Sequence, residues 1–250
     1  MVRTIRLLVG YDGTAFHGWQ VQPRLRTVQG EIEGALRDLL QGELRRVSGA
    51  GRTDTGVHAR GQVASFRCES ELPAHAFAPL LNRRMPRDVR VRAAAEAAPE
   101  FHARHSARAR RYAYRVIEGP DVLMERFAWN LGRRPDWARV DAATRALEGE
   151  ADFEAFGAAS TPASTTVCRV RRARWRRLRG GARLDIVADH FLYHMVRNIV
   201  GAAMRVQKSP DPAAAMRAIL DSRDRARVGA TAPARGLCLE HVEYATEGWT

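Results

Sequence analysis

Residues 43–68 read ELRRVSGAGRTDTGVHARGQVASFRC, and this stretch decides the fold of the first part of the chain. Residues 43–51 and 61–68 have the composition of β-strands. The segment between them, 51–58, contains two glycines, an arginine and an aspartate, with threonines interleaved. The sequence therefore predicts a strand, a tight loop and a second strand.

The loop is the first candidate for chemistry. Gly51 and Gly56 permit tight backbone geometry and the close approach of a large ligand. Such a loop can present Asp54 at a cleft, with Arg52 nearby to favour the ionised carboxylate. The alternative is an Asx-turn in an ordinary hairpin, in which Asp54 only binds its own backbone.

Outward from the loop, the pattern predicts a β-α-β-loop-β-α-β order over the first domain, residues 1–105. Its further elements are a strand at 4–10, a helix at 27–41 with Thr27 as N-cap, a short helix at 76–85 and a strand at 88–97.

A second domain, residues 106–250, repeats the mixture of strands and helices. It is expected to contain strands at 110–118, 168–179, 183–191 and 236–244, and helices at 135–149, 191–207 and 211–220. Asp136 is the expected N-cap of the first of these helices, and Gly180-Gly181 predicts a hairpin. The predicted fold class is α+β, with two α/β domains derived from ferredoxin-like units, a largely antiparallel sheet and a catalytic cleft between the domains.

Two segments have polar faces that suggest binding. In the helix expected at 191–207, one side is apolar and the other contains His194, Arg197, Asn198, Gly201 and Arg205. In the strand at 168–179, alternation groups Val170, Arg172, Arg174, Arg176 and Leu178 opposite Trp175. That face is either a surface for phosphates or a solvated sheet face blunted by charge. Tyr112 and Tyr114 alternate in the same way, either to stack on a base or to fill a core.

The charge of the chain favours a polyanionic partner. It contains 41 Lys+Arg against 28 Asp+Glu in 250 residues, a net charge of +13. Lys208 is the only lysine. A GC-rich genome explains part of the preference for arginine but not the surplus of charge, for which nucleic acid is the simplest partner.

Other classes of function receive no support from the sequence. No run of 18 apolar residues or signal peptide is present, and Cys68, Cys168 and Cys238 are expected to be reduced thiols, so we expect a cytoplasmic protein without a membrane partner. The pairs His190/His194 and His102/His105 lack the glutamate of a zinc helix, and no nucleotide cradle is found. We therefore expect neither a metal nor a cofactor.

Together these motifs resemble one family over nearly the whole chain. YDGTAFHGWQVQP from Tyr11, GAGRTDTGVHARGQVASF, FHARHSARARRYAYRV, DFEAFG, FLYHMVRNIVG and ATAPARGLCLEHVEY occur in the order found in the bacterial tRNA pseudouridine synthase A (TruA) family. The resemblance implies an isomerase that converts uridine to pseudouridine in the anticodon stem-loop of tRNA, around positions 38–40. It also implies a homodimer and an Asp-dependent reaction without a cofactor.

The resemblance also implies roles for particular residues. Asp54 is the catalytic aspartate, Arg197 pairs with it, Arg52 helps to displace the target uridine, Tyr112 packs against the base, and Leu239 lines the base pocket. We expect further substrate contacts from His58, Arg110, Arg111, His194 and Asn198. The family often has an aromatic residue where Cys238 stands, although Leu237 and Leu239 still supply an apolar wall. Whether Asp54 attacks C1′ or C6, or works through a glycal intermediate, is left open by the sequence.

Overall fold

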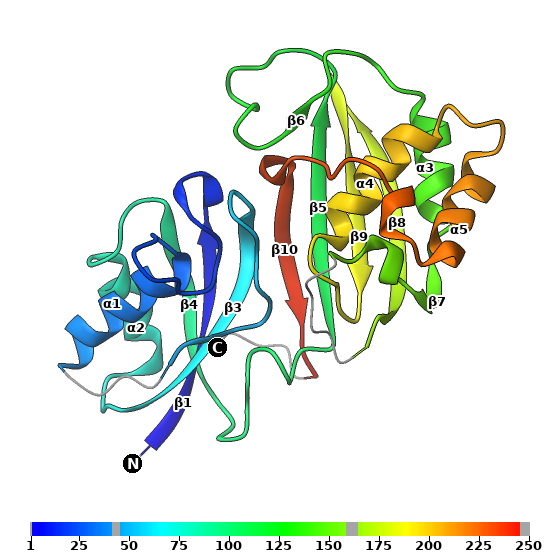
Figure 1. Cartoon of the computed structure of the whole chain (residues 1–250). Helices are drawn as coiled ribbons and strands as arrows, with labels where there is room; N and C mark the ends of the chain where they lie inside the picture. Colours follow the sequence, from blue (N-terminus) through cyan, green and yellow to red (C-terminus); the bar gives the residue numbers. More distant parts are fainter. Residues whose placement is uncertain (1, 42–45, 159–164, 246–250) are drawn as a thin grey trace. The chain divides into compact units, whose positions relative to one another are not determined.

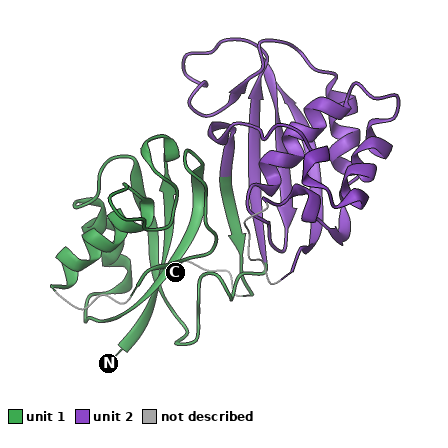
Figure 2. Ribbon diagram, viewed as in Figure 1, with its two compact units in different colours: residues 1–108, 239–250 green, residues 109–238 purple. Residues whose placement is uncertain are grey.

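The computed structural model describes residues 2–41, 46–158 and 165–245, and the chain forms two compact units. Unit 1 consists of residues 1–108 and 239–250, and unit 2 of residues 109–238 (Figure 2). Strand β10 (Leu237–Glu243) lies beside β3 (His58–Glu69), so the end of the chain joins the unit formed by its beginning.

Unit 1 is a sheet with helices on one face (Figure 1). The strand order is β4-β1-β3-β10, and β1 is antiparallel to both β3 and β4. The short strand β2 adds to β3. The bounds are β1 Val2–Tyr11, α1 Val28–Leu40, β2 Ser48–Gly49, β3 His58–Glu69, α2 Phe77–Asn82 and β4 Val89–Ala97. Residues 43–45 of the first predicted strand lie outside the described residues, and its remainder supplies β2.

The core of unit 1 follows from alternation along β1 and β3. Ile5, Leu7 and Val9 are fully buried, and they lie opposite Phe66, Ala64 and Gln62 in the register of the pair. The same face packs on the helices, since Phe66 contacts Phe77 of α2 with ring centroids 5.5 Å apart. Helix α1 begins where predicted, because the Thr27 side chain accepts a hydrogen bond from Gly30 N.

Unit 2 has the strand order β5-β9-β8-β7, antiparallel throughout, with β6 parallel to β5. Asp136 and Asp211 cap α3 and α5, and the β8–β9 hairpin turns at Arg179-Gly180. The bounds are β5 Ala109–Ile117, β6 Trp129–Asn130, α3 Trp137–Arg145, β7 Gly149–Asp152, β8 Val167–Leu178, β9 Gly181–Ala188, α4 Met195–Val206 and α5 Pro212–Ser222. The predicted α+β class with largely antiparallel pairing is confirmed.

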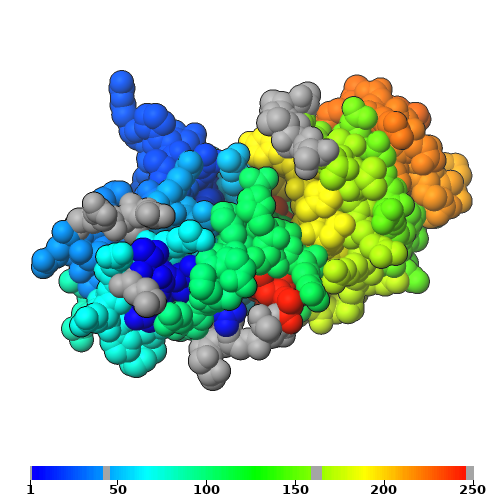
Figure 3. Space-filling model, turned by 90° about the horizontal axis from the view of Figure 1, so that it is seen from below, coloured from blue at the N-terminus to red at the C-terminus, as the bar shows by residue number. Residues whose placement is uncertain are grey.

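Helices α3, α4 and α5 cover one face of the sheet of unit 2 (Figure 1). Trp175 of β8 meets Trp137 of α3 on that face, with ring centroids 5.2 Å apart. One side of α5 contributes to the surface of the unit, in orange in Figure 3. Among the described residues, none of the helices is both long and apolar enough to cross a membrane.

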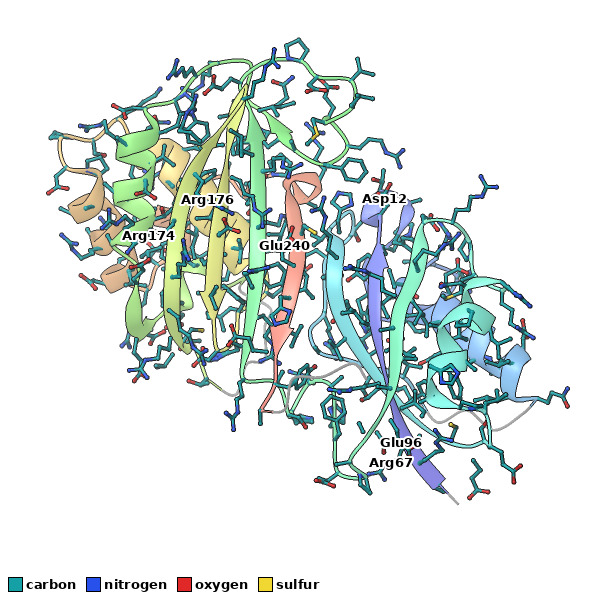
Figure 4. The ribbon with its side chains drawn as sticks, turned by 180° about the vertical axis from the view of Figure 1, so that it is seen from behind. Asp12, Arg67, Glu96, Arg174, Arg176 and Glu240 are labelled. Carbon is teal, nitrogen blue, oxygen red and sulfur yellow. The ribbon has the colours of Figure 1, made fainter. Side chains whose placement is uncertain are left out.

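The prediction for the arginine strand was wrong in one respect. Simple alternation placed Val170 with Arg172 and Arg174, but the pairing of β8 with β9 shifts register between Val170 and Arg172. This β-bulge turns Val170 to the buried face, where it is only 1% exposed. Arg174 and Arg176 lie on the other face, which the helices leave open (Figure 4).

Candidate active site

The loop between β2 and β3 has its backbone fixed at both ends. Ala50 N donates to Val63 O (2.8 Å), and Val57 N donates to Asp54 O (3.1 Å) to close a turn. Gly56 has φ +78°, a conformation that glycine adopts without strain. The side chain of Asp54 is half-buried and Arg52 is exposed. The loop predicted from the sequence is therefore present, and it is rigidly connected to the sheet.

The segment that follows β1 packs directly on this loop. Trp19 N donates to Thr53 O (3.0 Å), and Gly56 N donates to Phe16 O (3.3 Å). Gly18 has φ +83°, and a Cβ atom there would lie 2.7 Å from Thr53 O. Only glycine allows the two backbones to approach in this way. The YDGTAFHGW motif and the aspartate loop thus form one structure.

Sequence reasoning missed three buried polar residues beneath the loop. The hydroxyl oxygens of Tyr11 and Thr53 lie 2.8 Å apart, and Gln62 Nε2 donates to Gly51 O at 2.8 Å. Their exposed fractions are 5%, 6% and 0%. These contacts hold the residues on either side of Arg52. A signal existed, because Gln62 is a polar residue at a core-facing position of a strand whose neighbours on that face are Ala64 and Phe66.

His58, a predicted substrate contact, is the first residue of β3 and is almost fully buried. Its Nδ1 accepts a hydrogen bond from Gly13 N at 3.0 Å. That nitrogen therefore carries no proton in this arrangement, so its 3.3 Å approach to Asp12 Oδ1 is not a hydrogen bond that it donates. These contacts join the turn at Gly13–Ala15 to β3. The role of His58 toward substrate stays a prediction.

In unit 2, Tyr112 and Tyr114 share the helix-covered face of β5, as their alternation predicted. Tyr114 is fully buried and donates its hydroxyl to Pro233 O (2.7 Å), and burial raises its pKa above the ordinary value for tyrosine. Tyr112 is 8% exposed, and its ring meets Phe191 edge-on, with centroids 5.2 Å apart and an interplanar angle of 88°. Both tyrosines are thus buried within β5, and Tyr112 also packs against Phe191 in the irregular segment before α4.

The helix predicted over 191–207 starts later than expected, at Met195. His194 precedes it in the left-handed region, with φ +63°, so residues 191–194 cannot continue a helix. Instead Ala158 N donates to Tyr193 O (3.0 Å), and the rings of Tyr193 and His194 stack 3.9 Å apart. The helical spacing that grouped His194 with Arg197 was therefore wrong, because hydrogen bonds outside the helix fix this segment.

The supposed polar side of α4 is also mostly a packing surface. Asn198 is fully buried; its Nδ2 donates to Phe156 O (2.7 Å) and its Oδ1 accepts from the Thr231 hydroxyl (2.7 Å). A Cβ atom on Gly201 would lie 2.0 Å from Ala230 O, so the chain near residue 230 packs closely against this side. Asn198 thus has a structural part here, and its predicted contact with substrate stays a prediction.

Arg197 lies in the first turn of α4 and is half-buried. Its Nε donates to Ala232 O (2.8 Å), while Ala232 N donates to Arg197 O (3.2 Å). A cation in the first turn opposes the helix dipole, so the stability of the helix does not explain an arginine here. The backbone of residue 232 instead fixes the direction of the guanidinium group.

The other predicted contacts differ in exposure. Arg110 is half-buried and its Nη1 donates to Asp189 O (2.8 Å), whereas Arg111 is exposed. Leu239, in β10, is fully buried. Two arginines on the open face of β8 pair with acids, Arg174 with Glu148 (2.8 Å) and Arg176 with Asp185 (2.6 Å). These ion pairs connect β8 to Asp185 of the neighbouring strand β9 and to Glu148, the residue before β7.

Both units contain parts of the sequence that match a known protein family. A family model described as tRNA pseudouridine synthase matches residues 7–106 and 143–245. Asp54 and Arg197 lie inside the matched ranges, and Tyr112 lies between them. An α+β protein with an aspartate on a glycine-bracketed loop, matched in this way, falls in the class of pseudouridine synthases.

Curated relatives narrow the assignment. Proteins named tRNA pseudouridine synthase A from Moorella thermoacetica and Chlorobium luteolum are each 41% identical, covering 96% and 97% of this chain and 99% and 96% of the relatives. The protein of that name from Acetivibrio thermocellus is 38% identical over 97% of this chain and all of its own length. A solved Cbf5-Nop10-Gar1 complex is similar over 81% of this chain and 54% of the matched chain, with 11% identity and a TM-score of 0.36, too low to add to the argument. The chain belongs to the tRNA pseudouridine synthase A family.

Proposed function

We propose that this protein isomerises uridine to pseudouridine in the anticodon stem-loop of tRNA, around positions 38–40, with Asp54 as the catalytic residue. Membership in the family supports the reaction. The single observation that supports Asp54 is its setting: the backbone of its loop is bonded to β3 and to residues 16–19, while its own side chain stays half-exposed. A carboxylate that meets a large substrate needs a fixed backbone and partial exposure to solvent, and Asp54 has both.

The chemistry requires a carboxylate but no redox group. The N1–C1′ bond of uridine breaks, the uracil turns, and a C5–C1′ bond forms. The hydrogen on C5 leaves as a proton and N1 gains one, so no electrons enter or leave. Asp54 serves as nucleophile toward C1′ or C6, or as the base of a glycal route, and the proposal holds for each of these paths.

Three side chains are proposed to assist Asp54. Tyr112 stacks on the uracil after the nucleotide is extruded from its helix, since a stacked base is out of reach. Arg52, which is exposed, occupies the space that the nucleotide leaves. Arg197 pairs with the carboxylate, and this pairing would explain an arginine in the first turn of α4. Leu239 lines the pocket for the base.

The remaining proposals concern the partners. The net charge of +13 supports binding to tRNA phosphates, with an affinity that falls as salt rises. Arg111 is exposed and Arg110 half-buried, so Arg111 is the better candidate for a phosphate contact. We propose that the protein acts in the cytoplasm, where its substrate is found, as a homodimer whose subunits share one tRNA.

The direct test is release of tritium from tRNA labelled at C5 of uridine. Asp54→Asn should reduce release on the order of a thousandfold or more, because it removes the charge at the reaction centre, and should leave tRNA affinity within about twofold. Asp38→Asn, an exposed carboxylate of α1, is the matched control and should release tritium at the wild-type rate. Unchanged release by Asp54→Asn would refute the assignment.

The same assay separates the rival functions. A non-catalytic RNA-binding protein would bind tRNA without releasing tritium in any variant. An RNA glycosidase or nuclease would liberate free uracil or shorten the RNA, whereas isomerisation leaves the length and mass of the RNA unchanged. Mapping pseudouridine in the product then tests the positions around 38–40.

A further inference from the structure

A cysteine of β8 contacts a histidine in the turn that follows β9, and this histidine lies beside an aspartate of the same turn. His190 Nε2 lies 3.3 Å from Cys168 Sγ, and His190 Nδ1 lies 3.0 Å from Asp189 Oδ1. The order of contacts is that of a nucleophile, a base and an orienting carboxylate. Cys168 is fully buried, however, and burial together with Asp189 and Asp152 raises its pKa to about 12. A buried neutral thiol is not a nucleophile, so the role of this cluster is not nucleophilic catalysis.

The ring of His190 lies between β8 and Asp189. Its Nε2 is within hydrogen-bond distance of the Cys168 thiol, at 3.3 Å, and the thiol also donates to Thr166 O at 3.7 Å. On the other side of the ring, Nδ1 lies 3.0 Å from Asp189 Oδ1, an oxygen that accepts from the backbone N–H groups of Arg169 and His190. These contacts connect β8 through the ring of His190 to Asp189.

Asp189 ties this turn to both strands that flank β9. On the β8 side, Arg169 N donates to Asp189 Oδ1 (3.0 Å). On the β5 side, Arg110 Nη1 donates to Asp189 O (2.8 Å). His190 N also donates to Asp189 Oδ1 (2.6 Å), so three hydrogen bonds to Asp189 fix the backbone at residues 189 and 190.

The next residue after the cluster is Phe191, whose ring meets Tyr112 edge-on at 5.2 Å. An edge-to-face contact sets the orientation of both rings. We propose that Asp189, His190 and Cys168 form a side-chain lock that positions Phe191 and, through it, the ring of Tyr112 that stacks on the target uracil. His190 is thus a positioning residue, and the inference rests on the proposed function of Tyr112.

The lock predicts a particular kinetic effect. His190→Ala should lower kcat for tritium release about tenfold and leave KM for tRNA within about twofold, because a misplaced ring weakens orientation in the reaction more than binding. His190→Asn should recover most of the loss, since its polar amide can take the place of Nδ1 beside Asp189. The control, His75→Ala, changes an exposed histidine in the turn Ala74–Ala76 and should behave as wild type.

A double-mutant cycle tests whether the effect passes through Phe191. In a Phe191→Leu background, His190→Ala should lower kcat less than twofold further, because the element that it positions is already gone. Full multiplication of the two effects would show that His190 supports the fold in general and would overturn the proposal. Equal kcat in wild type and His190→Ala would overturn it as well.

Amide hydrogen exchange of the peptide that covers residues 189–194 tests the lock without activity. Exchange should be at least about tenfold faster in His190→Ala than in wild type, and near wild type in His190→Asn. If wild type releases no tritium, the proposed function fails, while the exchange result still decides whether the lock exists. If His190→Ala does not fold, Cys168→Ala removes the contact with His190 Nε2 from the other side, and exchange unchanged from wild type in that variant would overturn the lock.

Discussion

The loop at 50–57 and the turn at 189–194 each present a proposed site residue, but they are held in different ways. In unit 1 the loop is fixed mainly through its backbone, by partners on β3 and by Trp19, with Gly18 and Gly56 at positive φ. In unit 2 the turn is fixed by the side chains of Asp189, His190 and Cys168. The residue with positive φ in this turn is His194, not a glycine. Backbone fixation leaves a signature of glycines in the sequence, whereas fixation by side chains leaves none at the turn itself. The first region should therefore be sensitive to added atoms and the second to lost polar groups.

The largest effect on stability is expected at Gly18. Gly18→Ala places a Cβ atom 2.7 Å from Thr53 O at a residue with φ +83°. We expect the free energy of unfolding to fall by about 2–3 kcal/mol, measured by urea denaturation, with a loss of activity. Gly34→Ala is the control, because nothing lies within 4 Å of its Cβ position inside α1, and it should raise stability by up to about 1 kcal/mol. Equal effects of the two substitutions would show that the loop is not packed as described.

Asn198 tests the expectation that unit 2 is sensitive to the loss of a polar group. Asn198→Ala removes the bonds to Phe156 O and Thr231 from a fully buried position and should cost about 2 kcal/mol of unfolding free energy. Asn130→Ala, at a partly exposed asparagine, should cost less than about 1 kcal/mol. A loss of tRNA affinity with an unchanged melting temperature would instead make Asn198 a substrate contact, as the sequence suggested.

Tyr11 gives a smaller effect that bears directly on the aspartate loop. Tyr11→Phe removes the hydroxyl 2.8 Å from Thr53 Oγ1 and should reduce the free energy of unfolding by about 1 kcal/mol. Because Thr53 precedes Asp54, kcat for tritium release should also fall several-fold, about as expected for a small displacement of a reacting group. Tyr193→Phe, at an exposed ring in unit 2, should change neither quantity. An unchanged kcat in Tyr11→Phe would mean that the buried hydroxyl pair does not position the loop.

Local signals explain which parts could be predicted from the sequence. Thr27 and Asp136 cap their helices as predicted, and alternation identified the strands, because these features depend on neighbours along the chain. The bulge after Val170 and the late start of α4 at Met195 depend on contacts with other strands and loops. The periodicity of the sequence therefore predicted neither of them. At the candidate site, glycines marked the aspartate loop, while its supports Tyr11 and Gln62 lie on two strands that the sequence does not show to be neighbours. The grouping of Asp54 with Tyr112 and Arg197 stays a prediction for the experiments above.

The smallest effect expected is chemical and concerns the cysteines. Cys68, Cys168 and Cys238 form no disulfide. Burial raises the pKa of Cys168 to about 12 and also raises the pKa of Cys68, so both thiols stay protonated at pH 8. Iodoacetamide should therefore modify the half-exposed Cys238 first, and the other two only after denaturation, as measured by peptide mass spectrometry. Rapid alkylation of Cys168 in the native protein would mean that the turn at 189–194 opens easily. The side chains of Asp189, His190 and Cys168 would then not hold this turn in place.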